Sequence, residues 1–254
     1  MDFLDSALLI LLALFCAAII AGFIDTLVGG GGLITIPALM AAGLPPIYAL
    51  GTNKLQAVGG SGTAAITLFL KRQFTLTEVA PLMVAAFIGA IVGTLIVHRI
   101  DTEQLDIIVP IVILAIAIYF LLAPSNSLQV RNPRVTKRVY GLTAVPAIGV
   151  YDGMFGPATG SFFVLAGSSL RGQEVVSATK IAKPLNFATN AASLSTFIVF
   201  GTIYWQYGLV MLFGQFIGAR IGASLLMTIN PNVLRGLVIA LCVVMLSVQW
   251  LSSS

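Results

Sequence analysis

Charged side chains are scarce in this chain of 254 residues: Asp, Glu, Lys and Arg together make up 9% of it. An ordinary soluble domain carries about 25% charged residues. Hydrophobic residues reach 58%, and a soluble fold of this length could not bury so much apolar surface, because the buried fraction rises only slowly with size. The composition therefore excludes a soluble domain and predicts a polytopic membrane protein.

Histidine and cysteine are nearly absent. The chain has one histidine, His98, and two cysteines, Cys16 and Cys242, which both lie in hydrophobic stretches. A zinc site needs a set of Cys, His or carboxylate ligands, and a cysteine nucleophile needs a nearby base. We therefore expect no metal site, no cofactor and no enzymatic activity.

The net charge of +4 does not indicate nucleic-acid binding. Four basic residues gather in one polar loop between hydrophobic segments: Arg131, Arg134, Lys137 and Arg138. In a membrane protein, basic loops mark the cytoplasmic side. No nucleic-acid partner is expected.

Long hydrophobic runs are abundant. They cover residues 6–24, 26–43, 49–70, 77–97 and 105–123 in the first half of the chain, and crossing a bilayer takes about 20 residues. The second run contains four consecutive glycines, Gly29 to Gly32, and Pro37, which disfavour a continuous helix. Unwound backbone is tolerated in a membrane only inside protein or beside a water-filled cavity. We therefore predict half-helices inside the bundle, both here and at the matching glycine-rich break of the second half, Gly156 to Gly160.

The second half repeats the first. Asp152 in GVYDGMFGPATGSFF (149–163) matches Asp25 in GFIDTLVGGGGLI at an offset of 127, and Lys183 matches Lys54 at an offset of 129. FIGAIVG (87–93) matches FIGARIG (216–222) at the same offset of 129. A register held over this distance indicates an internal duplication. The predicted units are residues 1–123, a basic cytoplasmic linker at 124–138, and residues 139–254.

Charge placement predicts the topology. Five crossings in each half would place most basic loops in the cytoplasm, whereas four would move Arg171 and Arg235 outside, so the positive-inside rule favours five. An odd number also makes the two halves inverted repeats, a common plan in transporters. The predicted fold is an all-α, polytopic integral membrane protein with about 8–10 hydrophobic segments, some of them interrupted.

Several linked motifs resemble the TauE/SafE family of sulfite-exporter-like permeases. They are GFIDTLVGGGGLITIPALMAAG and ALGTNKLQA in the first half, and GVYDGMFGPATGSFF and AKPLNFATNAAS in the second. The resemblance covers nearly the whole chain. It implies a multi-pass protein of the bacterial inner membrane that exports small sulfur-containing anions: sulfite, sulfonates or sulfoacetate. The second half departs from the four glycines of the first, so the two halves need not contribute equally to a site.

Lys54 and Lys183 are the first candidates for substrate binding. A lysine inside a membrane span is costly, and such residues are functional candidates by default. In inverted repeats, these equivalent lysines would converge near one axis and suit a small dianion. The alternative is that each lysine neutralises an aspartate or extends to the interface.

Asp25 and Asp152 are the matching acids. Either could carry a proton and couple transport to a proton gradient, because burial raises the pKa of a carboxyl group. The alternative is structural: each aspartate pairs with the lysine of its own repeat, or caps the half-helix that follows it.

Further candidates surround these charges. Unwound backbone and half-helix N-termini can bind an anion, and side-chain amides and hydroxyls can donate hydrogen bonds to it. Close helix packing is the alternative role of these small and polar residues. The predicted substrate-binding residues, besides the two lysines, are Thr52, Asn53, Gln56, Asn186, Asn190, Gly30, Gly31, Gly32 and Gly160. Lys180 and Arg220 are secondary candidates.

These observations predict a secondary transporter that exports a small anion by alternating access, with coupling to protons left open. A passive anion channel and an intramembrane aspartyl enzyme are the alternatives. The expected partners are the small anion and the lipid bilayer, and the formation of a homodimer is left open.

Overall fold

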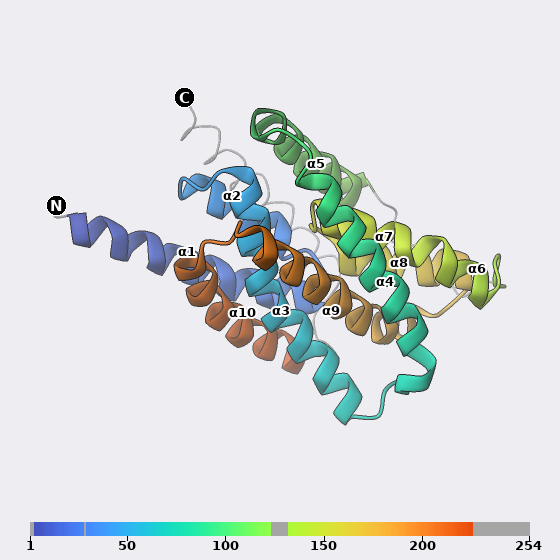
Figure 1. Cartoon of the computed structure of the whole chain (residues 1–254). Helices are drawn as coiled ribbons and strands as arrows, with labels where there is room; N and C mark the ends of the chain where they lie inside the picture. The colour runs from blue at the N-terminus through green and yellow to red at the C-terminus, as the bar shows by residue number, and fades with distance from the viewer. Residues whose placement is uncertain (1–2, 28, 123–131, 226–254) are drawn as a thin grey trace.

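The computed structural model describes residues 3–27, 29–122 and 132–225, and all of its regular structure is helical (Figure 1). Helices follow in this order: α1 (Phe3–Leu27), α2 (Gly32–Ala41), α3 (Pro46–Leu70), α4 (Leu76–Val97), α5 (Thr102–Leu122), α6 (Lys137–Leu142), α7 (Ala144–Met154), α8 (Thr159–Arg171), α9 (Val175–Phe200) and α10 (Trp205–Leu225). The all-α prediction is confirmed. Arg131, most of the predicted linker, Arg235 and Cys242 lie outside the described residues.

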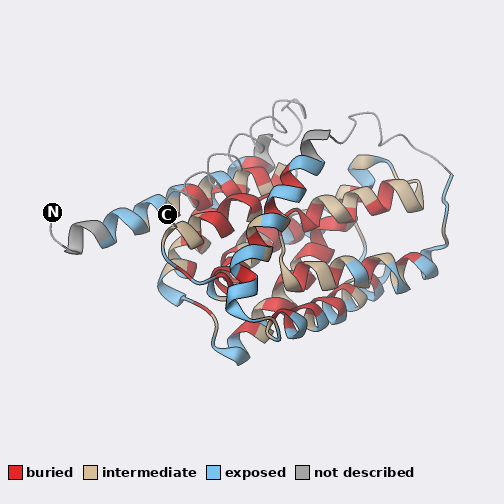
Figure 2. Ribbon diagram, turned by 90° about the horizontal axis from the view of Figure 1, so that it is seen from above, coloured by how far each residue is buried: buried red, intermediate tan, exposed pale blue. Residues whose placement is uncertain are grey.

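The outer surface of the bundle is apolar. Within the described residues, three helical stretches are long and apolar enough to cross a membrane: Ala7–Leu27, Leu76–Val97 and Thr102–Tyr119. Large hydrophobic side chains such as Ile107, Ile111 and Phe213 are exposed on the outside, while the buried residues face the centre of the bundle (Figure 2). Helices α3 and α9, with 25 and 26 residues, carry most of the buried polar residues. A polar interior within an apolar surface is the arrangement expected of a membrane protein.

Both predicted interruptions are present. The first separates α1 from α2, where Gly29 has φ +84°, and the second separates α7 from α8, where Gly156 has φ +95°. Glycine adopts this left-handed conformation without the steric cost that a side chain brings. Pro37 is different: it was expected to interrupt a helix, but α2 continues through it.

The two halves pack through equivalent helix pairs. Helix α1 lies along α10, with Gly218 against Ile19 and Gly222 against Phe23, and α4 lies along α7, with Gly93 against Val150. In each pair the residue numbers rise together, so the helices are parallel. The FIGAIVG and FIGARIG motifs are therefore packing surfaces, in which glycines let two backbones approach closely. The inverted relation of the halves stays a prediction.

The turn between α1 and α2 sets the direction of the first three helices. Helix α3 is parallel to α10, as α1 is, because Leu55 packs on Gly208 and Gly59 on Leu212. Helix α2 runs the opposite way, since its first turn contacts α3 through Thr35 and Asn53 and its end leads into the start of α3. With ten residues, α2 is about 15 Å long and cannot cross a 30 Å core. Helix α2 therefore leads the chain back toward the end of the bundle where α1 begins, so that α1, α2 and α3 alternate in direction, and the number of complete crossings stays a prediction.

This turn leaves the predicted grouping of basic residues intact. Arg171 donates a hydrogen bond to the carbonyl oxygen of Val135 in the linker, and Lys137 faces Glu78 near the start of α4. The loop with Lys71 and Arg72 precedes α4 and so lies at this same end of the bundle. We call it the linker end, which the positive-inside rule predicts to be the cytoplasmic one.

Candidate functional site

The two candidate lysines reach across from one repeat to the other. The Nζ atom of Lys54 lies 3.0 Å from Oδ1 of Asp152 and also donates to the main-chain carbonyl of Asp152. The Nζ atom of Lys183 donates to the main-chain carbonyl of Asp25, at 2.7 Å. The sequence interpretation that each aspartate pairs with the lysine of its own repeat is therefore corrected, because each lysine holds the break of the other half.

The two aspartates differ in their surroundings. Asp152 is 1% exposed, and its Oδ1 also accepts a hydrogen bond from the Thr159 hydroxyl at 2.6 Å. Asp25 is only partly buried, and its Oδ1 accepts the N–H of Gly31 at 3.1 Å. Asp152 is therefore held in a buried ion pair, while the Asp25 carboxylate holds the backbone at the start of α2.

A small cavity of about 20 Å³ lies between the two breaks. It is lined by Asp25, Gly32, Asn53, Gln56, Ala57, Gly156, Thr159, Gly160, Asn186, Asn190 and Gln215. Seven of these were predicted: Asp25, Gly32, Asn53, Gln56, Gly160, Asn186 and Asn190. The structure thus brings much of the predicted site together around one cavity, which we call the central cavity.

Amide side chains dominate the walls of the central cavity. Nε2 of Gln56 donates to the Thr35 hydroxyl and to Oδ1 of Asn53, so one network fixes both amides. Nδ2 of Asn190 donates to the main-chain carbonyl of Asn186 at 2.8 Å. These bonds orient the side chains before any ligand binds, which lowers the cost of ordering them.

Two amide donors face the second break. Nδ2 of Asn53 lies 3.6 Å from the position that a Cβ of Gly156 would take, and Nδ2 of Asn186 lies 3.7 Å from that of Gly160. Helix α8 begins at Thr159, so its N-terminus with its positive dipole end borders the same space. The arrangement presents hydrogen-bond donors to a small anion.

The lysines lie behind the cavity wall. Neither is among the lining residues, but Nζ of Lys54 is 2.8 Å from the position of a Gly156 Cβ. Both ammonium groups already have oxygen partners on the opposite break. They therefore do not form a free pair of cations, and their role in binding substrate stays a prediction.

Other predicted residues lie away from the cavity. The Thr52 hydroxyl accepts the N–H of Tyr204 at 3.0 Å, which joins α3 to the start of α10. The N–H of Gly31 is taken by Asp25, and Gly30 is not a lining residue. Lys180 is partly buried on α9, and Arg220 is exposed on α10.

Gln215 lines the cavity but was not predicted, whereas Gly156 and Thr159 line it as parts of the second glycine-rich break. Gln215 is 1% exposed and sits directly before FIGARIG, where the first half has Ala86. A glutamine inside an apolar run, directly before a motif that occurs in both halves, was a usable signal. Within the described residues, Oε1 of Gln56 and of Gln215 have no hydrogen-bond partner, so the cavity also offers acceptors.

Comparisons with known proteins agree with this picture. The sequence profile of the family described as "Sulfite exporter TauE/SafE" matches residues 14–248. A "Probable membrane transporter protein ORF9" of Sinorhizobium sp is 43% identical over 235 residues, covering 92% of this chain and 90% of the relative. The "Probable membrane transporter protein" of Haemophilus influenzae is 40% identical over 242 residues, covering 95% of both chains.

A third relative, the "Probable membrane transporter protein YfcA" of Escherichia coli K12, is 42% identical over 237 residues, covering 93% of this chain and 88% of the relative. The comparison with solved structures found no match. The family match and these relatives span nearly the full length of the chain. This protein is a member of the TauE/SafE family of membrane transporters.

Proposed function

We propose that this protein is a secondary transporter that exports a small sulfur-containing anion, such as sulfite or a sulfonate, by alternating access. The observation that carries the proposal is the central cavity, whose walls come from both halves of the chain and from both helix breaks. Binding sites of transporters built from inverted repeats lie at such an interface, next to discontinuous helices.

The chemistry of the walls suits an oxyanion. Asn53, Asn186 and the first turn of α8 supply donors without a net charge, and the lysines behind them are each balanced by a nearby aspartate. Such a neutral, polar site binds an anion through dipoles and releases it readily. An inside-negative membrane potential favours exit by about 2.3 kcal/mol per charge at 100 mV.

The size of the cavity supports alternating access. A volume of about 20 Å³ holds roughly one water molecule, which is less than sulfite needs. The two halves must therefore separate around the cavity for an anion to bind. The cross-repeat contacts of Lys54 and Lys183 connect the parts that would move.

Asn186→Leu tests the site. We expect sulfite efflux from proteoliposomes to fall at least about tenfold, because a donor to a charged ligand is lost. Leucine has the same branched arrangement of side-chain heavy atoms as asparagine, and Asn186 borders the central cavity, so the protein should still be recovered folded. Ser195→Ala, on the exposed side of the same helix, is the matched control and should transport like the wild type. Equal flux in Asn186→Leu and wild type would remove Asn186 from the site.

Asp25 is the proposed coupling residue. Its carboxylate lines the central cavity, with Lys183 of α9 as the charged group facing it, whereas Asp152 is held by Lys54. We expect an inward proton gradient to accelerate sulfite efflux by the wild type and not by Asp25→Asn. Asp106→Asn, an exposed aspartate of α5, serves as the control and should keep the acceleration. A gradient that accelerates Asp25→Asn as strongly as the wild type would exclude Asp25 as the proton carrier.

A further inference from the structure

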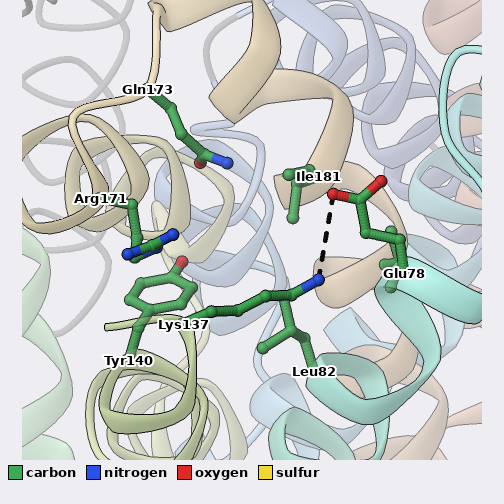
Figure 3. A pocket seen from close by; sticks show the side chains of 8 residues that line it. Glu78, Leu82, Lys137, Tyr140, Arg171, Gln173 and Ile181 are labelled. Carbon is green, nitrogen blue, oxygen red and sulfur yellow. Dashed lines mark ion pairs between the residues drawn. The ribbon is translucent and has the colours of Figure 1, made fainter. Parts of the chain in front are cut away.

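A second cavity lies at the linker end, between the start of α4, helix α6, the end of α8 and the start of α9 (Figure 3). Its volume is about 60 Å³, three times that of the central cavity. The polar residues that line it are Glu78, Lys137, Tyr140, Arg171 and Gln173. None of them belongs to the site described above.

The walls of this cavity are fixed by the fold. Nη1 of Arg171 donates to the carbonyl oxygen of Val135, and the N–H groups of Arg134 and Val135 both donate to the carbonyl of Leu170. These bonds fasten the linker to the end of α8 and hold the guanidinium at the cavity, beside the hydroxyl end of Tyr140 (Figure 3). Tyr140 is 4% exposed. These bonds therefore hold the Arg171 side chain at the cavity even when no ligand is bound.

The charge balance favours an anion. Lys137 and Arg171 are opposed by Glu78, whose Oε1 lies 4.0 Å from Nζ of Lys137. Both members of this pair are 52% exposed, and exposed pairs contribute little to stability, about 0–1 kcal/mol. Lys137 can therefore leave Glu78 for a better partner, which leaves two cations facing the cavity.

The donors match an oxyanion. A guanidinium binds two oxygens of one anion through its planar fork, and a lysine ammonium adds a mobile point charge. The Tyr140 hydroxyl and the Gln173 amide can donate to further oxygens. The volume of about 60 Å³ is several times the space that one water needs, so a small oxyanion fits.

We propose that this linker-end cavity is a second oxyanion site, which binds sulfite or the phosphate group of an anionic lipid from the cytoplasmic side. Helix α8 joins it to the central cavity, because Thr159 and Gly160 line one and Arg171 lines the other. If the anion is the transported one, the linker-end site holds it before the central site does. That reading rests on the proposed function, whereas the binding chemistry does not.

The test compares Lys137→Gln with Lys71→Gln, an exposed lysine at the same end that does not line the cavity. Binding is measured first, as the rise in melting temperature of the purified protein with sulfite and, separately, with short-chain phosphatidylglycerol. We expect Lys137→Gln to weaken the binding of one of these anions about tenfold, the effect of losing one charge-assisted contact. Lys71→Gln should match the wild type. Unchanged binding of both anions to Lys137→Gln would overturn the proposal.

Measurements of sulfite transport then show whether the bound anion is the substrate or the phosphate group of a lipid. In phosphatidylcholine vesicles, a substrate site predicts that Lys137→Gln raises the KM for internal sulfite about tenfold while kcat is unchanged, and that added salt reduces the difference. A lipid site predicts equal KM values there and a response to added phosphatidylglycerol only in the wild type. Sulfite binding that depends on Lys137, without any flux of sulfite or of an organic sulfonate, would support this site and contradict the proposed function.

Discussion

Replacing Lys54 by methionine should destabilise the protein by about 3–5 kcal/mol, the usual cost of leaving one member of a buried ion pair without its partner. Lys54 and Asp152 are each 1% exposed. Methionine keeps an unbranched apolar side chain but lacks the ammonium group, so Asp152 loses the ion pair and its main-chain carbonyl loses a hydrogen bond. Unfolding in mixed micelles with increasing denaturing detergent measures the change.

Two further variants identify the cause. Lys54→Met combined with Asp152→Asn should recover most of the stability, because no buried charge is left and the amide can still bond Thr159. Lys71→Met, at an exposed position after α3, should change stability by less than about 0.5 kcal/mol. A loss below 1 kcal/mol in Lys54→Met, or no recovery in the double variant, would contradict the cross-repeat pair as a structural bond.

Gly93→Ala should destabilise the protein by about 1–3 kcal/mol, the usual effect of overfilling a packed contact. A Cβ at Gly93 would overlap the carbonyl oxygen of Val150, so α4 and α7 would have to move apart. Main-chain atoms of a helix cannot move aside as the end of a flexible side chain can. The melting temperature of the purified protein measures the change.

Gly141→Ala is the matched control. The nearest atom to its added Cβ would be Cδ2 of Leu82, at 3.0 Å, the end of a flexible side chain. Both glycines are helical, so both variants gain about 1 kcal/mol of helix propensity, and only Gly93→Ala meets backbone. If the two variants melt at the same temperature, backbone contact between α4 and α7 is not what holds this pair of helices.

Much of the architecture follows from the sequence because each feature has a local cause. Glycine runs break helices wherever they occur, so the breaks near Gly29 and Gly156 could be predicted. Composition alone indicates a membrane protein. Asn53 and Asn186 lie close in sequence to the buried lysines, so they were predicted to face the protein interior. The structure places both beside the central cavity.

Contacts between the halves could not be predicted in the same way. The duplication shows that Lys54 corresponds to Lys183, but it does not show which aspartate each lysine meets, because that depends on how the repeats interlock. How much of residues 26–43 is helical could not be predicted either, because this stretch is largely hydrophobic whether or not its backbone is helical. Gln215 has no counterpart in the first half, so a comparison of the repeats passes over it.

The most direct test of the account is sulfite counterflow in proteoliposomes that contain the wild-type protein. A carrier that alternates around the central cavity returns to the inside faster with an anion bound, so external sulfite should accelerate the efflux of radiolabelled internal sulfite. Efflux that is present but not accelerated would contradict alternating access and indicate a channel. No sulfite efflux, with efflux of an organic sulfonate instead, would keep the mechanism and change the anion.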